Sequence, residues 1–152
     1  MLYRASVTDV KCKRLSRRTG YLAVVMQHYP RFLTKEMIDE YIHDLAPQRE
    51  LFAEFKARDR DMKDHDAAFA AVDYENRFEL NGAGMAALER LSTMSRDRDV
   101  FLLCQCQSLE KCHGDLLLLL AKHHFAAPVA RIRIRYPGFE DRLNATSGGN
   151  SR

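Results

Sequence analysis

The chain has no tryptophan, only four cysteines and four prolines, and no long apolar run. A membrane-spanning helix needs roughly 18 to 20 consecutive apolar residues, so we predict that no segment crosses a bilayer. A secretory signal also needs an apolar stretch, and none occurs in the first residues, MLYRASVTDVKCKR. Few cysteines without such a signal favour reduced thiols in the cytoplasm over a disulfide framework.

Charge is present but unevenly distributed. The 152 residues carry a formal net charge of +3. Residues 1–35 hold eight lysines and arginines against one acid, whereas residues 36–99 hold more acids than bases. A basic N-terminal segment can attract phosphate-rich partners, or it can be a solvated loop.

Short apolar runs alternate with helical patterns along the chain. Strands are predicted over Leu2–Val10, Tyr21–Met26, Val100–Cys104 and Val129–Tyr136. Helices are predicted over Met37–Leu45 with a cap near Thr34, around Leu51–Phe55, over Met85–Ser95 and over Asp115–Phe125. Strands separated by helices indicate an α/β fold, a Rossmann-like three-layer sandwich with a largely parallel sheet. We expect a single α/β domain over residues 1–137 and a disordered C-terminal tail over 138–152.

Two polar segments follow predicted strands. They are HYPRFLTK, after the second strand, and CQCQSLEKCH, after Val100–Cys104. Ligands of open α/β sheets bind beyond the carboxyl ends of the strands, so both segments are candidates to line one crevice. In the first segment, Arg31 at a strand end suits carboxylate or phosphate binding. A surface ion pair is the alternative.

The second segment offers thiol and imidazole chemistry. Ser108 is predicted as a helix N-cap, which places Cys112 and His113 just inside the helix. A helix N-terminus lowers a thiol pKa and attracts anions, so an activated thiol beside an imidazole is a reasonable catalytic pair. Cys104 ends the strand and faces the same loop. The alternative is that these cysteines pack as small hydrophobic residues.

Two other readings of the cysteines are weaker. Zinc sites usually pair ligands two to four residues apart, and adjacent side chains on a helix diverge by about 100°. We therefore predict no metal ligands. A phosphatase-like loop needs an arginine six residues after the cysteine, but that position is Glu110 counted from Cys104 and Cys112 counted from Cys106.

Three arginines alternate with apolar residues near the C-terminus. Arg131, Arg133 and Arg135 would project from one face of the last predicted strand. Such a row could follow a phosphate backbone. It could equally be the charged, solvated face of an edge strand.

Both polar segments resemble the signatures of one family. The first, HYPRFLTKEMIDEYIHDLAPQRELFAEF, and the second, VFLLCQCQSLEKCHGDLL, resemble motifs of domain-of-unknown-function family 488. The matching residues are Tyr29, Pro30, Arg31, Leu33, Lys35, Leu45, Ala46, Pro47, Leu51, Cys104, Cys112 and His113. The resemblance implies an α/β fold with a polar crevice of unassigned activity.

The chain departs from the family pattern inside these motifs. Phe32 stands where the family usually has Gly, Gln48 where it has Ser, Cys106 where it has Glu, and Gly114 where it has Arg. Some relatives also carry an Asp-Arg pair where this chain has Met26 and Gln27. These changes remove a carboxylate and an arginine from the presumed pocket, and Cys106 is not expected to act as a ligand.

The leading hypothesis is a small cytoplasmic protein with a pocket for an anionic small molecule, either a nucleotide or another phosphorylated metabolite. The ligand-binding residues would be Tyr29, Arg31, Lys35, Cys104 and Ser108, and Cys112 with His113 would supply Cys/His chemistry. The alternative is a non-catalytic nucleic-acid-binding or interaction module that uses the basic N-terminus and the Arg131–Arg135 strand. Cofactor, reaction type and oligomeric state are left open by the sequence.

Overall fold

Four parallel strands form one sheet in the order β1-β4-β2-β3. The computed structural model describes residues 1–150, with side chains as far as residue 146. The strands are β1 Leu2–Ser6, β2 Tyr21–Val24, β3 Glu40–Tyr41 and β4 Val100–Cys104. All three strand pairs are parallel, so the predicted parallel α/β sheet is confirmed.

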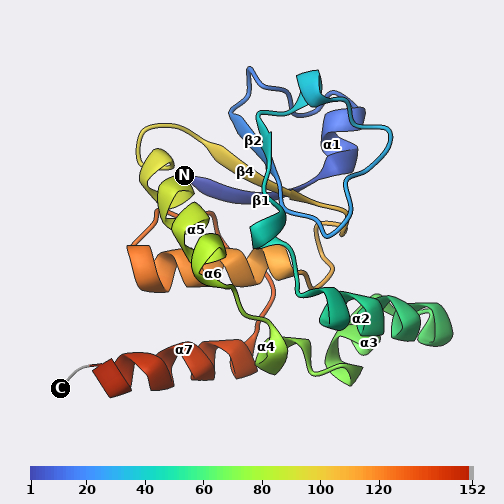
Figure 1. Cartoon of the computed structure of the whole chain (residues 1–152), viewed down its shortest axis with the longest axis vertical. Helices are drawn as coiled ribbons and strands as arrows, with labels where there is room; N and C mark the ends of the chain where they lie inside the picture. Colours follow the sequence, from blue (N-terminus) through green and yellow to red (C-terminus); the bar gives the residue numbers. More distant parts are fainter. Residues whose placement is uncertain (151–152) are drawn as a thin grey trace.

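Helices cover both faces of the sheet, which confirms the Rossmann-like sandwich. Figure 1 shows α1 (Val7–Lys11) on one side of the sheet, and α5 (Gly82–Met94) and α6 (His113–Phe125) on the other. The remaining elements are α2 Arg49–Met62, α3 His65–Ala71, α4 Tyr74–Arg77, α7 Pro137–Asn150 and the 3-10 turns η1 Lys35–Met37 and η2 His43–Leu45.

The sheet divides the core into two parts. Side chains alternate across a strand, so Leu102 of β4 packs in the large core against α5 and α6. Its neighbour Leu103 packs in the small core against Val7 and Val10 of α1. Both leucines are fully buried, which explains why the central strand is apolar at consecutive positions.

Several predicted elements are confirmed. Val100–Cys104 is β4, the helix predicted over Asp115–Phe125 is α6, and the one predicted over Met85–Ser95 is α5. Helix α5 begins after Asn81, whose side chain accepts a hydrogen bond from the backbone N–H of Gly84. None of the helices in the described part of the chain has the length and apolar character needed to span a bilayer.

The first strand is shorter than predicted. It ends at Ser6, whose hydroxyl accepts from the backbone N–H of Thr8, while Asp9 accepts from the backbone N–H of Ser6. This capping box starts α1 at Val7, so the last four residues of the predicted Leu2–Val10 strand are helical.

The helix predicted over Met37–Leu45 is wrong. The segment contains β3 between the turns η1 and η2. Its central backbone groups bond to β2: Asp39 N donates to Leu22 O at 2.9 Å, and Ile42 N donates to Val24 O at 2.8 Å. Pairing with a free sheet edge has overridden the helical spacing of the apolar residues.

The strand predicted over Val129–Tyr136 is also wrong. Its only described pairing is a bridge between Val129 and Leu2. Arg131, Arg133 and Arg135 are nevertheless exposed, as an alternating pattern requires. The segment then turns inward, and Tyr136 is 1% exposed.

The disordered tail expected over 138–152 is wrong for residues 138–150, which belong to α7. Phe139 and Leu143 of this helix are buried in the large core. They anchor a segment whose composition alone suggested disorder, and residues 151–152 lie outside the described residues.

Candidate functional site

The segments that follow β2 and β4 meet at one cavity. The two strands are hydrogen-bonded neighbours, with Val24 opposite Leu103, so their carboxyl ends share one edge of the sheet. The cavity beyond this edge has a volume of about 400 Å³. We call it the thiol cavity, because Cys104, Cys106 and Cys112 line it.

Five of the seven proposed site residues line the thiol cavity. They are Tyr29, Arg31, Cys104, Cys112 and His113. Lys35 lies in η1 with an exposed side chain and does not line it. Ser108 lies in the exposed loop between β4 and α6, and it lines a different cavity.

The prediction that Ser108 caps α6 is wrong. The helix begins at His113, and Cys112 is its N-cap, with φ −152°, ψ 147° and a side chain that accepts from Gly114 N at 3.3 Å. The preceding loop forms its own turn, because Glu110 bonds back to Gln107 through both its backbone N–H and its carboxylate. Residues 109–111, which a helix capped by Ser108 would contain, are therefore loop residues.

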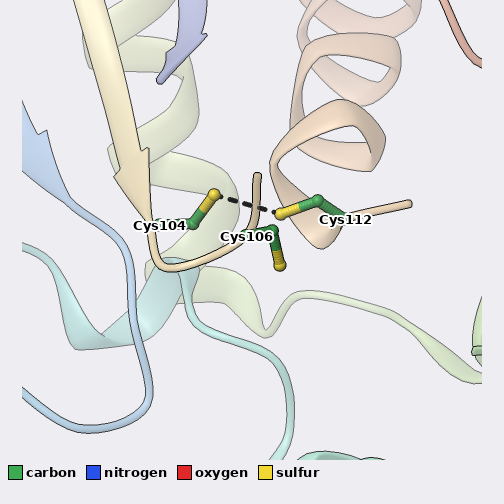
Figure 2. Close-up of side chains that lie close together, drawn as sticks. All are labelled: Cys104, Cys106 and Cys112. Atoms are coloured by element: carbon green, nitrogen blue, oxygen red, sulfur yellow. Dashed lines mark hydrogen bonds between the residues drawn. The ribbon is translucent and has the colours of Figure 1, made fainter. Parts of the chain in front are cut away.

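Three thiols gather between the end of β4 and the start of α6. The sulfur atoms of Cys104, Cys106 and Cys112 all lie within 4.8 Å of one another. Figure 2 shows the sulfurs of Cys104 and Cys112 pointing toward each other. Cys112 Sγ donates to Cys104 Sγ at 3.1 Å. Cys104 and Cys112 are buried, whereas Cys106, on the connecting loop, is half-buried.

The three thiols differ in the direction of their pKa shifts. Hydrogen bonds from Cys106 and Cys112, with the charge of Arg4, hold the pKa of Cys104 well below its usual range. Burial and the hydrogen bond to Cys104 raise the pKa of Cys112. This direction is opposite to the one predicted for Cys112 from a helix N-terminus. The hydrogen bond to Cys104 also raises the pKa of Cys106, so the arrangement favours one thiolate, on Cys104.

His113 has a defined orientation. Its Nε2 lies 2.7 Å from Val25 O, and a carbonyl can only accept, so Nε2 carries the proton. Nδ1 is then the unprotonated nitrogen, and it lies 3.8 Å from Cys112 Sγ. Burial lowers the pKa of the imidazole, which keeps His113 neutral.

A buried polar network supports the N-cap residue. Arg4 Nη1 pairs with Asp115 Oδ2 at 2.8 Å, and both side chains are 7% exposed. The hydroxyl of Tyr136 donates to Asp115 at 2.6 Å and accepts from Cys112 N at 3.0 Å. A Cβ atom on Gly114 would lie 3.1 Å from Arg4 Cγ, so glycine gives Arg4 room at the helix start.

Sequence reasoning missed Arg4, Asp115 and Tyr136. One signal was available: Asp115 is an acid directly before a block of five leucines, and a buried carboxylate there needs a partner. The partners come from β1 and from the segment before α7, and no local pattern connects them.

Aromatic and basic side chains form the rest of the thiol cavity. Helices α2 to α4 contribute the aromatic residues Phe52, Phe55, Phe69 and Tyr74, and the segment after β2 contributes Tyr29 and Phe32. Phe69 and Tyr74 stack with ring centroids 4.2 Å apart. The cationic residues are Arg31, Lys56 and Lys111, and no Asp or Glu is among the described residues that line the cavity.

A second cavity is lined in part by Cys106, Gln107 and Ser108 of the β4–α6 loop. Its volume is about 590 Å³. We call it the arginine cavity, because it is lined by Arg4, Arg14, Arg131 and Arg133. Two of these are paired with acids, Arg4 with Asp115 and Arg14 with Asp9 at 2.9 Å.

One family model matches the chain over residues 6–124, and it describes the active DUF488-N3 subclade, DUF488-N3a. The chain belongs to the DUF488 family. The match spans both strand-end segments and every residue named in the thiol cavity, whereas Arg4 and Tyr136 lie outside it. No curated protein and no solved structure matches the chain.

Proposed function

We propose that this DUF488 protein binds an anionic small molecule, a nucleotide or another phosphorylated metabolite, in the thiol cavity. The observation that carries the proposal is the meeting of Arg31, from the segment after β2, with the thiols and His113, from the segment after β4. A volume of about 400 Å³ falls within the usual range of small-molecule sites, roughly 300 to 1,000 Å³.

The charge of the lining favours an anion. Arg31 and Lys56 are exposed and Lys111 is half-buried. No carboxylate among the described lining residues offsets them. Uncompensated cations at the mouth of a cavity attract negatively charged ligands, and a guanidinium can bind phosphate through two parallel hydrogen bonds.

The aromatic wall favours a ligand with a planar, apolar part. Phe55, Phe69 and Tyr74 are buried and pack edge-to-face or stacked against one another. Phe52 is half-buried on the same helix as Phe55. A nucleobase could stack on such a surface while its phosphate reaches the cations, which is the reason to prefer a nucleotide.

The Cys/His chemistry would take place at the buried end of the cavity. Cys104, Cys112 and His113 are each less than 10% exposed, and all three line the cavity. Tyr29 also lines it, and its buried hydroxyl has no hydrogen-bond partner among the described residues. An unpaired buried hydroxyl is costly, so a polar group of the ligand would satisfy it.

Calorimetric titration with a panel of nucleoside monophosphates and sugar phosphates tests the proposal. Replacing Arg31 with Met should weaken binding about 10-fold or more, since a charge-assisted hydrogen bond contributes about 1.5–3 kcal/mol. Arg18→Met is the matched control, because Arg18 is exposed and does not line the thiol cavity. Equal affinities of the two variants, or no binding by the wild-type chain, would reject the proposal.

A nucleic-acid-binding module is the second candidate. The observation in its favour is that Arg131 and Arg133 line the arginine cavity together with Arg14 of the basic N-terminal segment. Binding to RNA or DNA should then weaken steeply with salt, and replacing both Arg131 and Arg133 with Gln should reduce the salt slope by about 2. Salt-independent binding, or none, would exclude it.

A further inference from the structure

We propose that Cys104, Cys106 and Cys112 bind a zinc ion at the buried end of the thiol cavity, with Nδ1 of His113 as the fourth ligand. The metal site stands on the geometry of these four side chains alone. Only a catalytic use of the zinc would rest on the proposed binding of an anionic ligand.

The spacing of the sulfur atoms fits a single thiophilic ion. Two thiolates on one tetrahedral zinc lie roughly 3.8 Å apart, because each Zn–S bond is about 2.3 Å. The three sulfurs here lie within 4.8 Å of one another, with Cys104 and Cys112 at 3.1 Å. A separation of the closest pair by several tenths of an ångström would admit the ion between them.

The imidazole lies beside one of the three thiols. Nδ1 of His113 lies 3.8 Å from Cys112 Sγ, close to the separation of a nitrogen and a sulfur ligand on one zinc, roughly 3.6 Å. Nε2 donates to the carbonyl of Val25 at 2.7 Å. Zinc-bound histidines typically donate their other ring N–H in this way, which fixes the tautomer and the ring plane.

The objection from adjacent residues does not apply. Cys112 and His113 would diverge by about 100° if both were inside a helix. Cys112 is instead an extended N-cap residue, and His113 is the first residue of α6. The expectation of no metal ligands rested on ligand spacing and, in part, on a helical start at Ser108. The proposal replaces that expectation and makes Cys106 a ligand.

Each ligand is held by a different part of the fold. Cys104 is the last residue of β4. The backbone N–H of Cys112 donates to Tyr136. The loop that carries Cys106 is held by Arg4, whose Nη2 donates to Gln107 O. The positive charge of Arg4 would also offset the net charge of −1 that three thiolates and one Zn²⁺ carry.

The metal would change the chemistry of the proposed site. Binding releases the thiol protons, so the three cysteines become thiolate ligands and cease to be free nucleophiles. With four protein ligands the zinc would be a closed, structural ion.

The test measures metal on the full chain. The protein is purified without chelators, its zinc content is measured, and the zinc-free reduced protein is titrated with Co²⁺, whose absorption reports thiolate coordination. We expect one zinc per chain and thiolate-to-cobalt absorption. Cys106→Ser should lower the Co²⁺ affinity at least 10-fold, and it is the preferred variant because Cys106 is only half-buried.

Cys12→Ser is the matched control, since Cys12 is exposed and lies outside the cluster. It should keep full metal affinity, and His113→Asn should lose at least 10-fold. A folded, reduced wild-type chain without zinc or Co²⁺ binding would overturn the metal site, as would a Cys104–Cys112 disulfide in metal-free protein that resists reduction. Titration of the metal-free chain with a nucleoside monophosphate separates this failure from that of the proposed ligand binding.

Discussion

The thiol cavity and the arginine cavity share Cys106, on the loop between β4 and α6, as a lining residue. They differ in how their positive charges are compensated. In the arginine cavity, Arg4 and Arg14 each meet a carboxylate. In the thiol cavity, the described lining residues include three cations and no acid.

The difference separates structural charges from charges available to a ligand. A guanidinium that is buried with a carboxylate, as Arg4 is with Asp115, is partly neutralised by that carboxylate, and breaking the pair destabilises the fold. Cations without a neighbouring acid in the cavity wall remain free to attract an anion. We therefore propose the thiol cavity as the ligand site, although the arginine cavity is larger and is also lined by the exposed Arg131 and Arg133.

The largest expected effect is on stability. Replacing Arg4 with Met leaves Asp115 buried without its cation, and should lower the free energy of unfolding by about 3–5 kcal/mol. Arg14→Met breaks an exposed pair and should cost less than about 1 kcal/mol. Urea denaturation measures both, and similar losses for the two variants would remove the distinction between the pairs.

The next effect is on binding in the thiol cavity. Phe52→Ala should weaken nucleotide binding about 10-fold, because stacking on an aromatic side chain contributes about 1–3 kcal/mol per base. Tyr3→Ala is the control, since Tyr3 lines the arginine cavity and stacks on Phe101. Calorimetric titration of the same nucleotide measures both, and a greater loss with Tyr3→Ala would move the ligand to the arginine cavity.

A smaller, pH-dependent effect is expected at an ion pair outside both cavities. Burial of Glu40 opposes its ionisation, but hydrogen bonds from Arg90 and Tyr21 prevail and lower its pKa. A carboxyl whose folded pKa is depressed stabilises the fold above its unfolded pKa, about 4.3, and loses this contribution as the pH falls through the folded pKa.

The stability difference between wild type and Glu40→Gln should thus be about 1 kcal/mol or less at pH 6 and should shrink below about pH 4.3. Urea denaturation at several pH values measures it. A difference that grows toward acid pH would contradict this assignment, and with it the view that pairing, not burial, decides the ionisation of Glu40.

The smallest effect is expected for the exposed arginines. If the ligand occupies the thiol cavity, replacing both Arg131 and Arg133 with Gln should leave nucleotide affinity unchanged within about 2-fold. These arginines do not line that cavity, and solvent and salt screen exposed charges that do not contact the ligand. Thermal unfolding should also be nearly unchanged. A strong loss of nucleotide binding would assign the ligand to the arginine cavity.

The predictions from sequence were correct for elements whose apolar residues are buried almost throughout. VFLLC became β4 and the leucine block became α6, because their residues are buried almost throughout. The helix predicted over Met37–Leu45 does not form, because the backbone of this segment is hydrogen-bonded to the edge of β2. The strand predicted over Val129–Tyr136 does not form, because no described strand pairs with this segment beyond Val129. Its alternating pattern reflects only the exposure of the arginines.

The candidate site was predictable in its two segments and not in its details. Strand ends at one sheet edge brought Arg31 and Cys112 to the same cavity. Serine is common at helix N-caps, but Ser108 lies in a turn closed by Gln107 and Glu110, and the helix begins at His113. Arg4 and Asp115 pair across more than a hundred residues, a contact that no local spacing encodes.

The hydrogen bond from Cys112 N to Tyr136 ties the thiols to the C-terminal helix. Tyr136 directly precedes Pro137, the first residue of α7. A fragment cut at residue 124, where the family match ends, would keep all four cysteines and His113 and still lose the hydroxyl that supports the N-cap. Activity or metal content measured on such a fragment would describe a different site, so expression for biochemistry has to extend through α7.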